Sequence, residues 1–190
     1  MIDVMEKESL SKKSISDLGK FFYPESIVVI GVSIKRLNLG QIIVSNNQRI
    51  GCKARLYGVG KDAGDLNGIP IFSGVKDLPE VPDVAIIITP AKTVPAIMRD
   101  CAEKGIKHVV IESGGFSEFA DQGRDLEQEV LNIARQWGMR VVGPNCISIV
   151  NLENGLVLPF VPLEDREVRK GRISIVAQSG GIALDCMRLL

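Results

Sequence analysis

The sequence predicts an α/β protein built on one open, parallel sheet with helices on both faces. Short β-branched runs, which suit strands buried on both sides, alternate with helical patterns along the chain. Glycine or proline closes several of these runs, and 45% of the 190 residues are apolar, enough for a sizeable core. Because strand and helix alternate, consecutive strands are expected to run parallel. The predicted strands cover residues 26–30, 55–59, 83–89, 108–112 and 139–142.

Three helices are predicted between these strands. The first spans residues 39–50. In the second, over 94–104, apolar residues follow the i, i+3, i+4, i+7 spacing of one helix face, and Thr93 is the candidate N-cap. The third follows Asp121, its candidate N-cap, and carries apolar residues on one face as far as Trp137. A glycine, the residue most often found just after a helix, follows each one: Gly51, Gly105 and Gly138.

The chain divides into four predicted segments. Residues 1–20 are polar and mixed in charge and are expected to form a flexible leader, and 21–150 contain the alternating strands and helices. Residues 151–171 lack periodicity and include the charged stretch EDREVRKG, which predicts a linker or an edge excursion. In 172–190 a strand over 172–177 leads into QSGG and the start of a helix, which predicts the first turn of a second domain.

Composition and charge argue against several classes of protein. Lys plus Arg and Asp plus Glu both number 23, whereas binding to nucleic acid or to an anionic membrane draws on surplus cations. The N-terminal residues do not resemble a secretory signal and no apolar block is long enough to span a bilayer, so we expect a cytoplasmic protein without membrane or nucleic-acid partners. The four cysteines are scattered and His108 is the only histidine, so no metal site is expected.

Ligands of open parallel sheets bind outside the carboxyl ends of the strands, which defines the candidate site. Five loops meet there: residues 31–36, 58–62, 89–91, 112–116 and 143–146. The first loop, GVSIKRLNLG, lacks the G-x-G-x-x-G spacing of nicotinamide and flavin dinucleotide sites. It offers instead a hydroxyl, Ser33, and two cations, Lys35 and Arg36, which suit phosphate groups. The alternative is that these cations are solvated loop charges.

The later loops carry fewer chemical groups. Lys61 suits a ligand with an extra phosphate on its ribose, or is a turn lysine without a partner. Glu112 either accepts a hydrogen bond from a ligand or only caps its strand. Cys146 lies at the ligand edge, but no second histidine exists to activate it as a nucleophile. His108 begins a strand at the opposite edge, which favours a structural role.

The stretches FFYPESIVVIGVS, WGMRVVGPNCISIVN and GRISIVAQSGG, and the run between IPIFSG and ESGGFSE, give the chain a resemblance to a known family. From about residue 21 onward it resembles the CoA-binding part of the NDP-forming acyl-CoA synthetases. The similarity is greatest to the α part of ADP-forming acetyl-CoA synthetase and more distant to succinyl-CoA synthetase α. The resemblance implies a Rossmann-like, doubly wound CoA-binding domain followed by the start of a flavodoxin-like ligase domain.

The resemblance also implies roles for individual residues. The residues expected to hold phosphate and ribose groups of CoA are Ser33, Ile34, Lys35 and Arg36, and Lys61 would meet the nucleotide end. Those expected to line the adenine or pantetheine path are Ile111, Glu112 and Ser113, and those expected near the thiol are Pro144, Asn145 and Cys146. The residues that match the family's helix start, which receives a phosphorylated histidine, are Ser179, Gly180 and Gly181.

The activity implied by the resemblance needs more than this chain. The family interconverts acyl-CoA, ADP and phosphate with acid, CoA and ATP, and His108 does not match its phosphohistidine. We therefore expect coenzyme A as the ligand, no catalytic residue here and no activity from the chain alone. The implied partner is an ATP-grasp β domain or subunit that binds ATP or ADP and Mg, within an oligomer. The alternatives are a stand-alone CoA-binding regulatory module and the CoA-binding part of a protein lysine acyltransferase.

Overall fold

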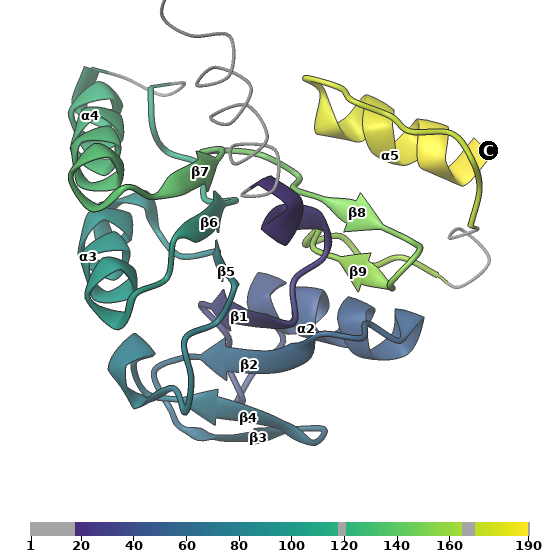
Figure 1. The fold of residues 1–190 in the computed structure, drawn as a ribbon, viewed down its shortest axis with the longest axis horizontal. Coiled ribbons are helices and arrows are strands. Elements are labelled where there is room, and N and C mark those ends of the chain that lie inside the picture. Colours follow the sequence, from purple (N-terminus) through teal and green to yellow (C-terminus); the bar gives the residue numbers. More distant parts are fainter. Residues whose placement is uncertain (1–17, 118–120, 165–169, 190) are drawn as a thin grey trace, which may run out of the picture.

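A seven-stranded sheet forms the centre of the molecule (Figure 1). The computed structural model describes residues 18–117, 121–164 and 170–189. The strands are β1 (Ser26–Ile30), β2 (Arg55–Val59), β3 (Gly64–Leu66), β4 (Ile69–Phe72), β5 (Val84–Ile87), β6 (His108–Ile111) and β7 (Arg140–Val142). Their order is β3-β4-β2-β1-β5-β6-β7, and only β3 with β4 is antiparallel. The strand order reverses at β1 and β5, so the predicted doubly wound, Rossmann-like sheet is confirmed.

Helices cover both faces of this sheet. The helices are α2 (Leu39–Ile50), α3 (Val94–Lys104), α4 (Asp121–Trp137) and α5 (Gly180–Leu189). Side chains alternate between the faces along a strand, so Val28 and Ile30 pack in the core under α3 and α4, whereas Ile27 and Val29 pack in the core under α2. All residues of β1, β5 and β6 are buried, which explains why every residue in these strands is apolar apart from Ser26 and His108 at the starts of β1 and β6.

The start of α3 differs from the prediction. Thr93 makes no side-chain capping bond to the helix. Its hydroxyl lies 2.8 Å from the carbonyl oxygen of Pro90 and 2.9 Å from the hydroxyl oxygen of Thr89. A 3-10 turn over Ala91–Thr93 precedes the helix and places this hydroxyl over the preceding loop. The local 3-10 turn thus uses the Thr93 hydroxyl that would otherwise cap the helix.

The β3–β4 hairpin was not among the predicted strands. Its turn places Asn67 and Gly68 at φ 53° and 87°, and the side chain of Asp65 accepts a 2.8 Å hydrogen bond from the Gly68 amide. Asn-Gly in this conformation is a strong hairpin signal, but the flanking strands are too short to show a clear alternation. β4 pairs with β2 and extends the sheet at one edge.

The sequence predicts a linker or an edge excursion over 151–171, but residues 150–163 pack onto the domain. A short antiparallel hairpin, β8 (Val150–Asn151) and β9 (Leu156–Val157), lies beside α2 (Figure 1). Leu156, Leu158 and Leu163 are fully buried. Apolar residues without periodicity can still be buried when a neighbouring element provides hydrogen bonds for their backbone groups. Asn46 and Asn47 of α2 provide such hydrogen bonds here.

At both ends of the described chain, the structure differs from the predicted segments. Residues 1–17 of the predicted leader lie outside the described residues, and 18–22 form a helical turn. Phe21 in this turn is buried and its ring lies 5.0 Å from that of His108, edge to face. Residues 172–177, predicted as a strand, are exposed and make no strand pairing, because no neighbouring strand offers them backbone partners. The helix predicted after QSGG is present as α5.

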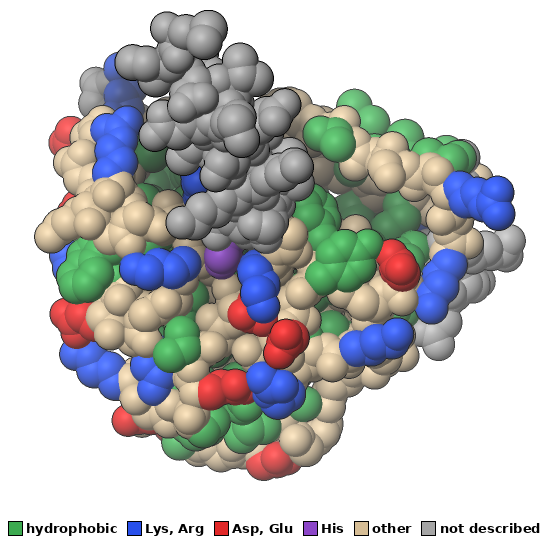
Figure 2. All heavy atoms as spheres, in the orientation of Figure 1, with side chains coloured by type: hydrophobic (Ala, Val, Ile, Leu, Met, Phe, Trp, Pro, Cys, Tyr) green, Lys and Arg blue, Asp and Glu red, His purple; other side chains and the backbone are tan. Residues whose placement is uncertain are grey.

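Charge is distributed without a dominant sign. On the face drawn in Figure 2, Lys and Arg side chains are interspersed with Asp and Glu, in keeping with the zero net charge. Among the residues that the structure describes, no helix is both long and apolar enough to cross a bilayer. The same residues contain no group of three His, Cys, Asp or Glu side chains arranged to hold a metal ion.

Candidate ligand site at the carboxyl edge

The five predicted loops form a continuous rim at the carboxyl edge of the sheet. The loop after β2 meets the loop after β1 so closely that a Cβ on Gly60 would lie 2.0 Å from the carbonyl oxygen of Val32. The loop after β5 is tied to the loop after β6, where Ser113 Oγ accepts a hydrogen bond from the Thr89 amide at 3.1 Å. Ser113 also accepts, through its carbonyl oxygen, a 3.1 Å hydrogen bond from the Asn145 amide in the loop after β7.

The first loop is a compact turn organised by Ser33. Its hydroxyl oxygen accepts hydrogen bonds from the backbone amides of Lys35 and Arg36, both at 3.3 Å. The loop leads into Asn38, which caps α2 by accepting from the Gln41 amide at 3.0 Å and donates to the carbonyl oxygen of Gly31 at 2.7 Å. The positive end of α2 therefore lies at the rim, where it favours an anion.

Asn38 organises the first loop of the rim, and the sequence prediction missed it. The signal was available, since asparagine directly before a helical segment is a preferred N-cap. Its second role, the hydrogen bond to Gly31, depends on how the loop folds back on β1 and has no local sequence signature. Ile34, predicted alongside Ser33, is partly buried and packs against the core on the α2 side.

The three cations of the rim differ in their partners. Lys35 Nζ forms an ion pair with Asp62 Oδ1 at 2.8 Å, which joins the first loop to the second. Neither the Lys61 ammonium nor the Arg36 guanidinium has a hydrogen bond or ion pair within the described part of the chain. Two cations are therefore available to a ligand at this end of the rim, and the third is already neutralised.

The loop after β6 carries a buried carboxyl group. Glu112 is 3% exposed, and neither of its carboxyl oxygens has a hydrogen-bond partner among the described residues. Burial raises the pKa of Glu112 to about 9, and the nearby hydroxyl of Ser148 opposes only part of this rise. No hydrogen bond of ordinary geometry joins the two groups, because Ser148 Oγ is also buried without a partner. Glu112 is thus held as a neutral acid at neutral pH.

The two predicted neighbours of Glu112 occupy different environments. The side chain of Ile111 is fully buried among the apolar residues under α3 and α4, so the core holds it away from the rim surface. Ser113 is also buried, and its hydroxyl and carbonyl oxygens brace the loops on either side. Ser148 was not predicted, and it stands in a loop without periodicity where only the folded chain reveals its position.

The loop after β7 closes over the end of β6. Asn145 has a positive φ of 52°, an uncommon conformation for a residue other than glycine, and its side chain is exposed. Cys146 Sγ donates to the carbonyl oxygen of Ile111 at 3.5 Å, and burial raises its pKa to about 11. Burial thus favours the protonated thiol, which is the less reactive form of cysteine. Pro144 lies between Gly143 and Asn145 and is partly buried.

The start of α5 meets this same loop. A Cβ on Gly180 would lie 2.6 Å from Ile147 Cβ, so glycine at this position allows the helix start to contact the 145–148 loop. Ser179 and Gly181 beside it are exposed. The structure therefore places the predicted helix start, Ser179 to Gly181, beside the loop that contains Asn145 and Cys146.

Comparison with known proteins agrees with this geometry. Residues 25–151 match the family model described as CoA binding domain. Acetate–CoA ligase [ADP-forming] II of Archaeoglobus fulgidus is 40% identical over 177 residues, which cover 90% of this chain and 26% of that protein. Acetate–CoA ligase [ADP-forming] I subunit alpha of Pyrococcus furiosus is 34% identical, over 90% of this chain and 37% of its own length.

A solved structure is similar to this chain in both sequence and fold. The dinucleotide-forming acetyl-coenzyme A synthetase 1 of Ca. Korarchaeum cryptofilum, in complex with phosphate and ADP, is 31% identical with a TM-score of 0.82. The alignment covers 90% of this chain and 36% of that one. The chain thus spans well under half the length of these relatives. Its matched residues include every loop of the carboxyl rim, and the chain belongs to the CoA-binding domain family.

Proposed function

We propose that the carboxyl rim binds coenzyme A and that the chain is the CoA-binding portion of an ADP-forming acyl-CoA synthetase. The whole protein would interconvert acyl-CoA, ADP and phosphate with free acid, CoA and ATP. The observation that carries the proposal is the division of the rim into a cationic end and a neutral end, within a domain of the CoA-binding family. CoA has the same division, with phosphates at one end and an uncharged pantetheine arm and thiol at the other.

At the cationic end, Arg36 and Lys61 would pair with the phosphates of CoA. The Ser33 hydroxyl uses its oxygen as an acceptor within the turn and retains a proton to donate to a phosphate oxygen. The start of α2 adds partial positive charge beside the same groups. Lys61, in the loop after β2, is the candidate partner of the ribose 3′-phosphate.

At the neutral end, Glu112, Asn145 and Cys146 would receive the pantetheine arm and thiol. A neutral carboxyl group can donate as well as accept a hydrogen bond, which suits an amide of pantetheine. Because Glu112 and Cys146 are both protonated near neutral pH, no negative charge stands close to the thiolate that CoA must form during acyl transfer. A rim without anions at this end stabilises that thiolate relative to a rim with an ionised carboxylate.

The reaction would need parts outside the described residues. The relatives named above are several times longer than this chain, which supports a further domain and an ATP-grasp partner that binds ATP or ADP with Mg. Residues 172–189 would be the start of the second, flavodoxin-like domain. Ile173, Val176 and Ile182 are largely exposed here, and that domain would cover them. The start of α5 would hold a phosphoryl group carried by a histidine of the same domain.

Titration calorimetry with CoA, dephospho-CoA and NAD tests the proposal. CoA should bind tightest, because dephospho-CoA lacks the phosphate that Lys61 is proposed to contact. Lys61→Ala should weaken CoA binding about tenfold or more, as expected for a lost charged hydrogen bond, and leave dephospho-CoA binding unchanged. Lys53→Ala, at the opposite edge of the sheet, is the matched control and should alter neither affinity. Tighter binding of NAD than of CoA would refute the proposal.

A further inference from the structure

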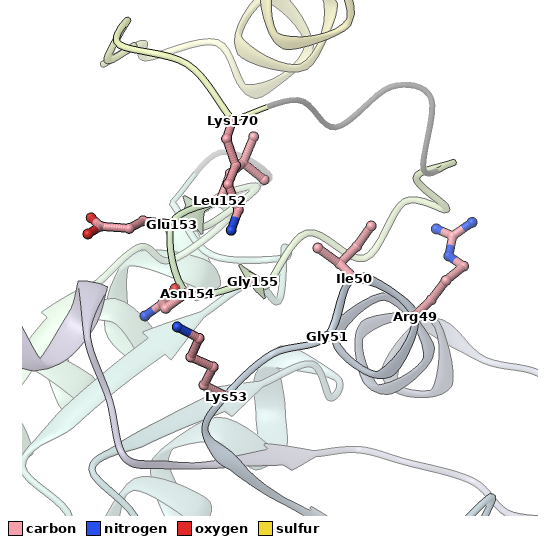
Figure 3. Close-up of a pocket in the computed structure, with 9 residues that line it drawn as sticks. All are labelled: Arg49, Ile50, Gly51, Lys53, Leu152, Glu153, Asn154, Gly155 and Lys170. Atoms are coloured by element: carbon pink, nitrogen blue, oxygen red, sulfur yellow. The ribbon is translucent and has the colours of Figure 1, made fainter.

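A pocket lined by both charged and apolar residues lies at the amino edge of the sheet, opposite the carboxyl rim (Figure 3). Its walls are the C-terminal end of α2, the segment that leads from α2 into β2, the turn between β8 and β9, and Lys170. α2 runs antiparallel to the strands, so its C-terminal end lies at their amino edge, away from the carboxyl rim. The pocket has a volume of about 320 Å³ and is partly open to solvent.

The pocket has preformed walls. The Lys53 amide donates to the carbonyl oxygen of Asn154 at 3.1 Å, which joins the segment before β2 to the β8–β9 turn. Asn47 is 1% exposed, and its side chain bonds both the amide and the carbonyl oxygen of Val157. Gly155 lies so close to α2 that a Cβ would approach the carbonyl oxygen of Gly51 to 2.7 Å. These contacts hold the β8–β9 hairpin in one position against the helix.

The charges that face this pocket are predominantly positive. Figure 3 shows Lys53 and Lys170 extending toward each other from opposite sides of the β8–β9 turn, whereas the carboxylate of Glu153 points away. Glu153 accepts a 2.7 Å hydrogen bond from the Tyr23 hydroxyl. Within the described ranges, neither the Lys53 nor the Lys170 ammonium has a hydrogen bond or an ion pair. Among the residues that the structure describes, two ammonium groups without ion pairs thus face this pocket, and the one carboxylate of its lining points away from them.

We propose that this pocket is a binding site for a small phosphate-bearing molecule, separate from the CoA rim. Lysine is a compact charge with three donors, and two lysines on opposite walls can each contact a different oxygen of one phosphate group. Ile50 and Leu152 line the same pocket and would contact the uncharged part of an organic phosphate. The site goes beyond the proposed function, because the five loops of the CoA rim contribute no residue to it.

The proposal is tested by ¹H–¹⁵N NMR titrations of the full chain with inorganic phosphate, pyrophosphate and ADP. We expect saturable amide shifts over 49–53 and 152–155. Lys53→Met and Lys170→Met should each weaken the binding about tenfold, and Lys53→Arg should retain it. Lys61→Met, at the carboxyl rim, is the matched control and should leave the amide shifts over 49–53 and 152–155 unchanged, whatever it does to shifts at the rim. The spectra of the free variants also report directly whether each variant keeps the native fold.

The three probes distinguish the possible sources of the phosphate group. Methyl shifts of Ile50 and Leu152 with ADP alone would identify an organic phosphate as the ligand, and equal responses to all probes would identify phosphate itself. Shifts confined to the carboxyl rim, shifts that persist in the Lys53→Met, Lys170→Met double variant, or a response that chloride reproduces would overturn the proposal. Competition by CoA at the same amides would also overturn it, because the two sites would not be separate.

Discussion

The two edges of the same sheet use their charges differently. At the amino edge, Arg55 binds Glu80 through two hydrogen bonds of 2.7 and 2.8 Å, and the Tyr57 hydroxyl adds a third at 2.6 Å. Lys20 pairs with Asp83 at 3.1 Å. At the carboxyl edge, Arg36 and Lys61 have no such partners in the described structure, and the buried carboxyl group of Glu112 has no hydrogen bond.

This contrast separates charges that stabilise the fold from groups left for a ligand. A paired charge has already used its electrostatic interaction inside the protein, whereas an unpaired cation in a loop gains that interaction only when an anion binds. By the same criterion, Lys53 and Lys170 differ from the paired side chains of Arg55 and Lys20 at the amino edge, because neither ammonium has a partner in the described structure. Because both lysines line one pocket, they are proposed to bind a phosphate group there.

The largest effect at neutral pH on stability and CoA affinity together is expected from crowding the contact between the first two rim loops. Gly60→Ala places a Cβ about where the carbonyl oxygen of Val32 lies, so the loops must separate, at a cost of about 2–3 kcal/mol of unfolding free energy. CoA binding should fall with it, because Lys61 and the first loop would no longer face the same ligand. Urea denaturation and calorimetry measure the two effects.

The control for this prediction is Gly19→Ala, since no described atom beyond its chain neighbours and its own helix backbone lies within 4 Å of the added Cβ. It removes a glycine without crowding the structure and should change neither stability nor CoA affinity. Equal behaviour of the two variants would show that the loops accommodate a side chain at Gly60 and that their close contact is unimportant.

A second prediction concerns the neutral acid at the carboxyl edge. The pKa of Glu112 is raised to about 9 in the folded chain. At a pH between the ordinary pKa of glutamate and 9, the folded state therefore keeps a proton on this group that the unfolded state has lost. Folding stability from this group is therefore present at low pH and is lost as pH rises toward 9. The unfolding free energy of the wild-type chain should fall by at most about 1.4 kcal/mol per pH unit over this interval, compared with that of the Glu112→Gln variant.

Denaturation of both proteins at several pH values between 5 and 9 measures this difference. Glu112→Asp, which keeps the ionisable group, is the matched control and should retain a pH-dependent stability. Parallel stability curves for the wild-type chain and Glu112→Gln would mean that the carboxylate is ionised in the fold, and the neutral end of the rim would lose its basis.

A smaller effect is expected at the paired amino edge. Arg55→Met should lower the melting temperature by about 1–2 °C, because exposed ion pairs contribute little, and CoA affinity should not change. Hydrogen bonds from Arg55 and Tyr57 hold the pKa of Glu80 at about 2, so this contribution is present above the ordinary pKa of glutamate and disappears as pH falls toward 2. A clear loss of CoA affinity in Arg55→Met would contradict the division between the two edges.

The smallest effect concerns the one paired cation of the rim. Asp62→Asn should free Lys35 and remove a negative charge near the phosphate groups, so CoA binding should tighten about two- to threefold at low salt. The gain should shrink as ionic strength rises, because both groups are substantially exposed. Lys35→Met, which removes the cation of the ion pair, should not tighten CoA binding. Weaker CoA binding in Asp62→Asn would show that the ion pair holds the loop in its binding conformation.

Much of the rim could be predicted from the sequence because it follows from strand order. Once β1, β2, β5, β6 and β7 are recognised as parallel, their following loops must meet at one edge, whatever the side chains are. The roles within the rim could not be predicted in the same way. Lys35 and Lys61 look alike in sequence, and only the folded loops show that Asp62 neutralises the first and leaves the second available.

The buried strands, the helices between them and the carboxyl-edge location of the site were determined by the sequence itself, through local periodicity and the apolar runs of doubly covered strands. The state of Glu112, the docking of the β8–β9 hairpin and the converging lysines were decided by the tertiary structure. The physical reason is distance along the chain: Asn47 bonds a backbone 110 residues away. Burial and electrostatic pairing of this kind depend on neighbours in space, which no local pattern specifies.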